Sequence, residues 1–173
     1  MATHRLPILS SGVRPDTTGE CFPETYDVLA TNDQWKRSIW RFGASNVAAP
    51  TVRHGLYGGF SAPKNYVGSA TLVIVWTTTL TSGDAVWDFE YRAVGGNDTE
   101  SLDQAGTQES VTVTDTAPSA ANERLETTIS LTSGNFAVDD DVEFYFARDG
   151  GDAADTLAGS ALLFSLALQF SDS

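Results

Sequence analysis

The sequence has few of the groups that enzymes use for covalent or acid–base chemistry. Its 173 residues contain one cysteine, Cys21, and two histidines, His4 and His54. A single cysteine excludes an internal disulfide and a thiolate metal site within one chain, so we expect synthesis in a reducing compartment. Because so few bases could activate a nucleophile, no catalytic triad is expected. The sequence therefore predicts a protein that is not an enzyme and needs no cofactor.

Long apolar runs and clustered positive charge are also missing. No apolar stretch approaches the roughly 20 residues of a membrane span, and residues 1–16 lack an apolar core long enough for a secretory signal. Residues 1–96 hold 8 acidic and 8 basic side chains, but residues 97–155 hold 14 acidic and 2 basic ones. We therefore expect no binding to nucleic acid or to anionic membranes. The acidic region is either a solvated face or the outward side of a polar molecule whose neutral side meets a partner.

Alternation of apolar and polar residues dominates the chain after residue 65. The predicted inward faces are Trp87, Phe89, Tyr91 and Ala93; Val111 and Val113; Leu125, Thr127, Ile129 and Leu131; Val142, Phe144 and Phe146; and Leu162, Phe164, Leu166, Leu168 and Phe170. One-sided burial with this period is typical of antiparallel sheets. Residues 70–78 are apolar on both faces, as in a central strand. Because no helical periodicity intervenes, the sequence predicts an all-β, antiparallel β-sandwich.

Turn residues punctuate these strands. Thr81–Asp84 ("TSGD") is predicted to turn residues 72–80 back onto residues 85–94 as a hairpin. The glycine-rich stretch Gly55–Phe60 ("GLYGGF") is not followed by a helix, so it predicts a bend or bulge and not a phosphate-binding loop. His54, just before it, is expected to be a partly exposed loop residue.

The first part of the chain differs from the rest. Five of the six prolines lie within the first 65 residues. We interpret residues 1–34 as an extended N-terminal arm outside the core, and residues 35–173 as the sandwich domain. The arm is either a loose terminus or a segment that reaches over a neighbouring subunit. Its apolar residues, which a partner would bury, are Leu6, Ile8, Leu9, Val13 and Phe22.

Two acidic clusters are weak candidates for a calcium site. One is Asp139–Asp141, and the other consists of Asp149, Asp152 and Asp155. Loop carboxylates can supply the oxygen ligands of calcium, but neither cluster matches an EF-hand loop. The alternative is turn chemistry, because Asp accepts backbone hydrogen bonds and tolerates left-handed conformations. We therefore predict no metal.

Four motifs in residues 60–170 resemble a recurrent family of bacteriophage virion proteins. They are "PKNYVGS" at 63–69, "WDFEYRA" at 87–93, "QESVTV" at 108–113 and "RDGGDAADTLA" at 148–158. The resemblance implies a jelly-roll-like sandwich made in the host's bacterial cytoplasm and located on the capsid surface of the virion. It implies a capsid decoration (cement) protein, a homotrimer that binds and stabilises the major capsid protein through many weak contacts.

This interpretation assigns contact residues. The candidate surface consists of the arm residues together with Trp35, Trp40 and Phe42, although core packing explains Trp40 and Phe42 equally well. The alternative function is a tail- or fibre-associated adhesin that binds a host surface glycan, for which Tyr57, Phe60 and Tyr66 could form an aromatic platform. A glycan hydrolase ranks last, because no acid/base pair is evident.

Overall fold

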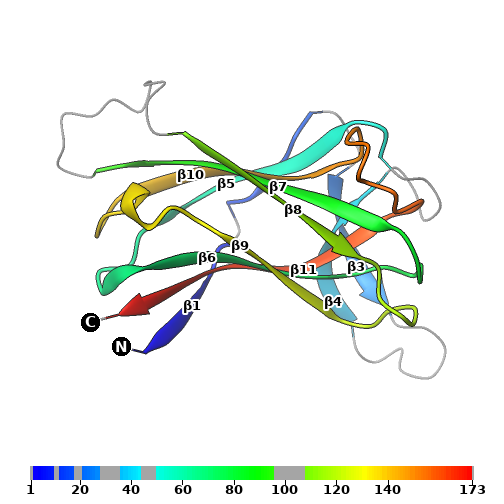
Figure 1. The fold of residues 1–173 in the computed structure, drawn as a ribbon, viewed down its shortest axis with the longest axis horizontal. Helices are drawn as coiled ribbons and strands as arrows, with labels where there is room; N and C mark the ends of the chain where they lie inside the picture. The colour runs from blue at the N-terminus through cyan, green and yellow to red at the C-terminus, as the bar shows by residue number, and fades with distance from the viewer. Residues whose placement is uncertain are drawn as a thin grey trace.

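The computed structural model describes residues 2–9, 12–17, 21–27, 36–43, 50–95 and 108–172, which form two facing antiparallel sheets (Figure 1). Sheet A contains β1 (Thr3–Pro7), β3 (Cys21–Asp27), β4 (Lys36–Phe42), β6 (Tyr66–Thr77), β9 (Leu125–Ser130) and β11 (Ala161–Asp172). Sheet B contains β2 (Arg14–Pro15), β5 (Arg53–Ser61), β7 (Asp84–Val94), β8 (Glu109–Thr116) and β10 (Asp141–Asp149). A 3₁₀ turn, η1 (Ser133–Asn135), precedes β10. The predicted β-sandwich is confirmed. Within the described ranges no helix is long and apolar enough to cross a membrane.

The strand order corrects the predicted hairpin. Sheet A runs β3-β4-β11-β6-β9, with β1 also paired to β11, and sheet B runs β2-β5-β10-β7-β8. The strands on either side of Thr81–Asp84, β6 and β7, therefore lie in different sheets. The turn residues mark where the chain bends, but each of these long strands takes both of its neighbours from elsewhere in the chain.

The inward faces of β7 and β10 are those that the alternation predicts. Trp87, Phe89, Phe144 and Phe146 are all at most 4% exposed and belong to one core cluster. The Trp87 ring stacks on Phe146 at a centroid distance of 5.3 Å and meets Trp76 of β6 edge-on at 5.5 Å. Such pairs stabilise by about 0.5–1.5 kcal/mol beyond the burial of their area. The Trp87–Phe146 pair lies within sheet B, and the Trp76–Trp87 pair joins the two sheets.

The face prediction for β11 is wrong in its first half. The pairing with β6 shifts register between Leu163 and Ser165, so the strand changes phase there. Leu163 is therefore the core residue, and Phe164 lies on the outer face, where its ring meets Tyr26 edge-on at 5.0 Å. Leu162 is buried as well, but outside the core cluster. A bulge of this kind leaves no mark in a uniformly apolar stretch.

The N-terminal segment is extended, as predicted, but it does not lie outside the core. Strand β1 pairs with β11, β2 with β5, and β3 with β4. Ile8 is 1% exposed and Cys21 2%, and both belong to the core cluster. The segment completes both sheets, which explains its apolar residues without a partner. The predicted boundary between residues 34 and 35 falls outside the described residues.

A buried ion pair closes one end of the sandwich. The guanidinium of Arg148, at the end of β10, donates to both carboxylate oxygens of Asp155 at 2.8 and 2.6 Å. It also donates to the carbonyl oxygens of Gly159 at 2.5 Å and Leu157 at 2.6 Å. The side chains of Arg148 and Asp155 are 0% and 1% exposed. The pair thus holds the connection between β10 and β11 against the core.

We expect Arg148→Met to lower the free energy of unfolding by about 3–5 kcal/mol, because it leaves the Asp155 carboxylate buried and unpaired. Urea denaturation measures this. The control is Arg124→Met, whose side chain is 61% exposed in its ion pair with Glu126, and which we expect to cost under about 1 kcal/mol. Equal losses in the two variants would show that the buried pair does not stabilise this end of the sandwich.

Candidate functional site

The outer face of sheet B carries a row of side chains that crosses the strands. The register sets Tyr57 of β5 beside Arg14 of β2 on one side and Tyr145 of β10 on the other. Tyr145 in turn lies beside Glu90 of β7. These positions alternate with core residues, so their side chains point away from the core. We call Arg14, Tyr57, Tyr145 and Glu90 the cross-strand row.

The Tyr145 ring is held in a fixed place on this face. A Cβ added to Gly55 would lie only 2.6 Å from Cζ of Tyr145, so the ring lies directly over this glycine. The Tyr145 hydroxyl donates to Oδ2 of Asp16 at 2.8 Å, and the Gly55 amide donates to the same oxygen at 2.7 Å. Burial, followed by this hydrogen bond, raises the pKa of Tyr145, so its hydroxyl stays protonated and donates.

Tyr57 is the exposed member of the row. It is 55% exposed, and its ring centroid lies 4.7 Å from that of Tyr145 at an interplanar angle of 37°. Two adjoining hollows share Tyr57 and Glu143 in their walls. The first, of about 240 Å³, is also lined by Glu90, Arg92 and Gln108, and the second, of about 370 Å³, by Arg14, Gly58 and Gly59.

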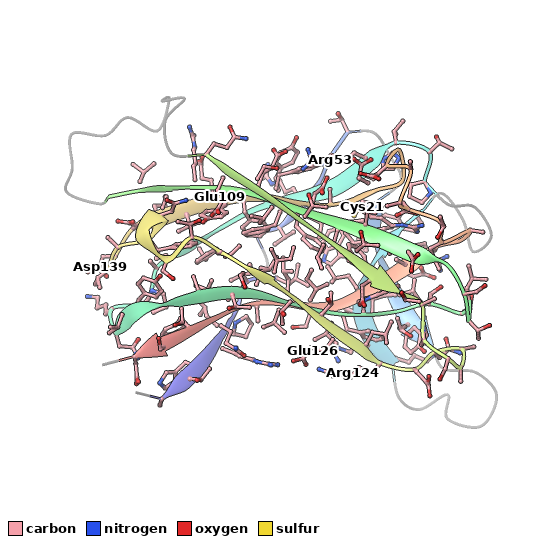
Figure 2. The ribbon with its side chains drawn as sticks, in the orientation of Figure 1. Cys21, Arg53, Glu109, Arg124, Glu126 and Asp139 are labelled. Atoms are coloured by element: carbon pink, nitrogen blue, oxygen red, sulfur yellow. The ribbon has the colours of Figure 1, made fainter. Side chains whose placement is uncertain are left out.

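Two arginines on this face form ion pairs. Arg53 contacts Asp88 at 3.0 Å and Glu90 at 2.6 Å, and its guanidinium carbon lies 4.9 Å from the centre of the Tyr145 ring. Arg92 contacts Glu143 at 2.6 Å. Burial raises the pKa of Asp88, although a hydrogen bond from Thr112 and the charge of Arg53 act in the opposite direction. Figure 2 shows Arg53 on the side of the molecule away from Arg124 and Glu126.

The glycine-rich stretch Gly55–Phe60 belongs to a regular strand, β5, and is not a bend or bulge. Strand β5 pairs with β10 without a register shift from Arg53 to Ser61. Its glycines make room for rings of β10, because a Cβ at Gly58 would lie 2.5 Å from the Phe144 ring. His54 is 2% exposed within this strand, so the prediction of a partly exposed loop residue is also wrong.

Four of the six carboxylates in the acidic clusters lie in turns, and a fifth belongs to the buried ion pair. Oδ1 of Asp149 accepts from the Gly151 amide at 2.9 Å, and Oδ1 of Asp152 accepts from the Ala154 amide at 2.8 Å. Asp155 is the partner of Arg148. In the other cluster Asp139 adopts a left-handed φ of 65°, and Asp140 accepts from the Ala137 amide at 2.7 Å. Among the residues that the structure describes, no group of three or more potential ligands could hold a metal ion.

The predicted partner-binding residues do not form one exposed surface. Ile8 and Val13 are buried in the core of the single chain, which corrects their assignment to a partner contact. Leu6, Leu9 and Trp40 are partly buried and pack against the core. The Phe22 ring lies on sheet A, 5.8 Å from the guanidinium carbon of Arg41. Trp35 lies outside the described residues.

The predicted aromatic platform reduces to one of its three residues. Tyr57 is exposed, but Tyr66 is 8% exposed and donates its hydroxyl to the Ser133 carbonyl oxygen at 2.9 Å. Phe60 is partly buried and packs against the core. The second ring of the face, Tyr145, was visible in the sequence as an aromatic residue on the polar side of an alternating strand. The sequence did not reveal that the Tyr145 ring lies over Gly55 of the neighbouring strand, because it does not show which strands pair.

No model of a known protein family matches this chain, and no curated protein matches it significantly. The family 35 carbohydrate-binding module (CBM35) of Paenibacillus barcinonensis is similar in structure, at 12% identity and a TM-score of 0.54, covering 99% of this chain and 100% of that one. A family 35 module from Clostridium thermocellum has 14% identity and a TM-score of 0.49, covering 97% and 98%. A tailspike domain of bacteriophage CBA120 has 8% identity and a TM-score of 0.46, covering 91% and 19%. The first likeness shows a shared fold; the two lower scores add nothing to it.

We expect Gly55→Ala to destabilise the protein by about 1–3 kcal/mol, because the new methyl group must displace the Tyr145 ring or the Phe146 carbonyl oxygen, 2.5 Å away. The matched control is Gly68→Ala in β6, where an added Cβ meets nothing within 4 Å. Thermal and urea unfolding of both variants measure the difference. If Gly55→Ala is as stable as Gly68→Ala, the close packing of Tyr145 on Gly55 is wrong.

Proposed function

We propose that this protein binds a glycan on the outer face of sheet B, and that it does so without catalysis. The observation that carries the proposal is the exposed Tyr57 ring, set beside the fixed Tyr145 ring and between two hollows. A pyranose ring has an apolar C–H face and a polar rim of hydroxyl groups. Stacked on Tyr57, the apolar face loses contact with water, while the rim reaches polar side chains.

The polar groups around Tyr57 suit the hydroxyl groups of a sugar. Glu90 and Glu143 accept hydrogen bonds, Arg92 donates them, and Gln108 does both. The ion pairs with Arg53 and Arg92 hold both carboxylates in place before a ligand arrives, which lowers the cost of binding. The fold agrees with this proposal, because the Paenibacillus barcinonensis neighbour is by name a carbohydrate-binding module.

The sequence resemblance to phage virion proteins would place this glycan-binding face on a virus particle. Glycan binding on a particle favours the adhesin alternative, in which the face attaches the particle to a host surface. The capsid-cement role, the homotrimer and the contact with the major capsid protein stay predictions from that resemblance.

We expect Tyr57→Ala to weaken glycan binding by about tenfold or more. The change removes the aromatic surface that the sugar would bury, which contributes ~1.5 kcal/mol or more to the binding free energy. Tyr57→Phe keeps the ring and should bind nearly as the wild type. A glycan array identifies the ligand, and calorimetry measures the affinities. Tyr26→Ala, on the outer face of sheet A, is the control. Undiminished binding by Tyr57→Ala would overturn the proposal.

A further inference from the structure

Among the residues that the structure describes, one cation of the proposed glycan-binding face has no carboxylate partner. Arg53 and Arg92 are both held in ion pairs. Arg14, in contrast, forms no ion pair within the described part of the chain, and its side chain is exposed at the β2 end of the cross-strand row. An exposed guanidinium beside a stacking ring is well placed to bind an anionic group of a ligand.

The space beside Arg14 is open because the neighbouring strand has no side chains there. Arg14, Tyr57 and Glu143 line the hollow of about 370 Å³, and between them lie Gly58 and Gly59 of β5. Gly59 faces outward, and its missing side chain leaves the hollow open, whereas Gly58 faces the core, where the Phe144 ring packs against it. The hollow therefore has the Arg14 guanidinium, the Glu143 carboxylate paired with Arg92, and a backbone floor, which leaves room for a substituent of a sugar ring.

The row is longer than one sugar. Sheet B has five strands, and the two hollows together involve residues of β2, β5, β10 and β7 and end at Gln108, next to β8. With neighbouring strands about 4.8 Å apart, the distance from β2 to β8 is ~19 Å. A pyranose unit spans roughly a quarter of that length. The face thus suits a chain of several sugars that lies across the strands.

The two ends of the row differ in charge. At the β7 end the carboxylate of Glu90 is paired with Arg53, and Glu143, which lines both hollows, is paired with Arg92. At the β2 end Arg14 has no ion-pair partner among the described residues. An anionic sugar would therefore be attracted to Arg14 at the β2 end, whereas the cations at the β7 end are already neutralised by carboxylates. The difference gives a bound chain a preferred direction.

We propose that the ligand is an acidic oligosaccharide of at least three units, whose anionic sugar lies at Arg14 beside Tyr57. This inference rests on the proposed function and adds the chemical class, the length and the direction of the ligand. The anionic group is a carboxylate or a sulfate, both of which fit the two-pronged donor geometry of a guanidinium.

The test uses a glycan array that contains matched neutral, carboxylated and sulfated oligosaccharides of one to six units. We expect acidic chains of three or more units to bind, with affinity that rises up to that length. Arg14→Gln should lower the affinity for acidic chains by about tenfold and leave that for neutral chains unchanged, whereas Arg14→Lys should retain part of it. Binding of acidic chains by the wild type should weaken with added salt, since the contact is exposed. Lys64→Gln, an equal change of charge away from the hollows, is the control.

The outcomes separate this inference from the proposed function. If neutral and acidic chains bind equally, and Arg14→Gln has no effect while Tyr57→Ala abolishes binding, the acidic ligand is wrong and glycan binding stands. Full affinity for a single acidic sugar would overturn the proposed length. If no glycan binds, or if Tyr57→Ala binds as the wild type does, both proposals fail. The carboxylated and sulfated arms of the array identify which anion binds.

Discussion

The buried contact between Arg148 and Asp155 fixes the strand on which the rest of the structure depends. Strand β10 is the centre of sheet B, and its inward side chains end at Arg148, whose donors reach Asp155 and two backbone carbonyl oxygens. Because side chains alternate along a strand, fixing the inward residues also fixes Tyr145 and Glu143 on the outward side. The proposed binding face is thus positioned by packing on its opposite side. This suits a binding surface, which gains affinity when its groups are ordered in advance.

Side chains that are absent shape the face as much as those that are present. On the outer face Gly55 lets the Tyr145 ring lie against the sheet, and on the core side Gly58 admits the Phe144 ring. Between Arg14 and Glu143 the same strand contributes a backbone floor. A glycine within a strand costs backbone entropy on folding. Three glycines among the nine residues of β5 are therefore expected only where a neighbouring side chain or ligand approaches the backbone closely.

The sequence predicts the layers of this fold better than its connections. Alternation identified the inward faces of β7 and β10 because large apolar residues occur at every second position. It failed at β11, where a bulge follows Leu163 inside an apolar run, and at the hairpin, because turn residues do not reveal which strands pair. Tyr57 could be proposed from the sequence as an exposed aromatic. Arg14 could not, because its partner strand lies about 40 residues away along the chain and β2 has only two residues.

A glycan that lies across the strands of sheet B would change the environment of the backbone amides in those strands, and nuclear magnetic resonance detects this directly. Backbone amide signals would be assigned and followed as the array-identified oligosaccharide is added. We expect the shifts to concentrate at β2, β5, β10 and β7, with the largest changes around Tyr57, and the signals of β3, β4 and β9 to stay unchanged. Shifts confined to sheet A, or to the loops at the ends of the sandwich, would contradict it.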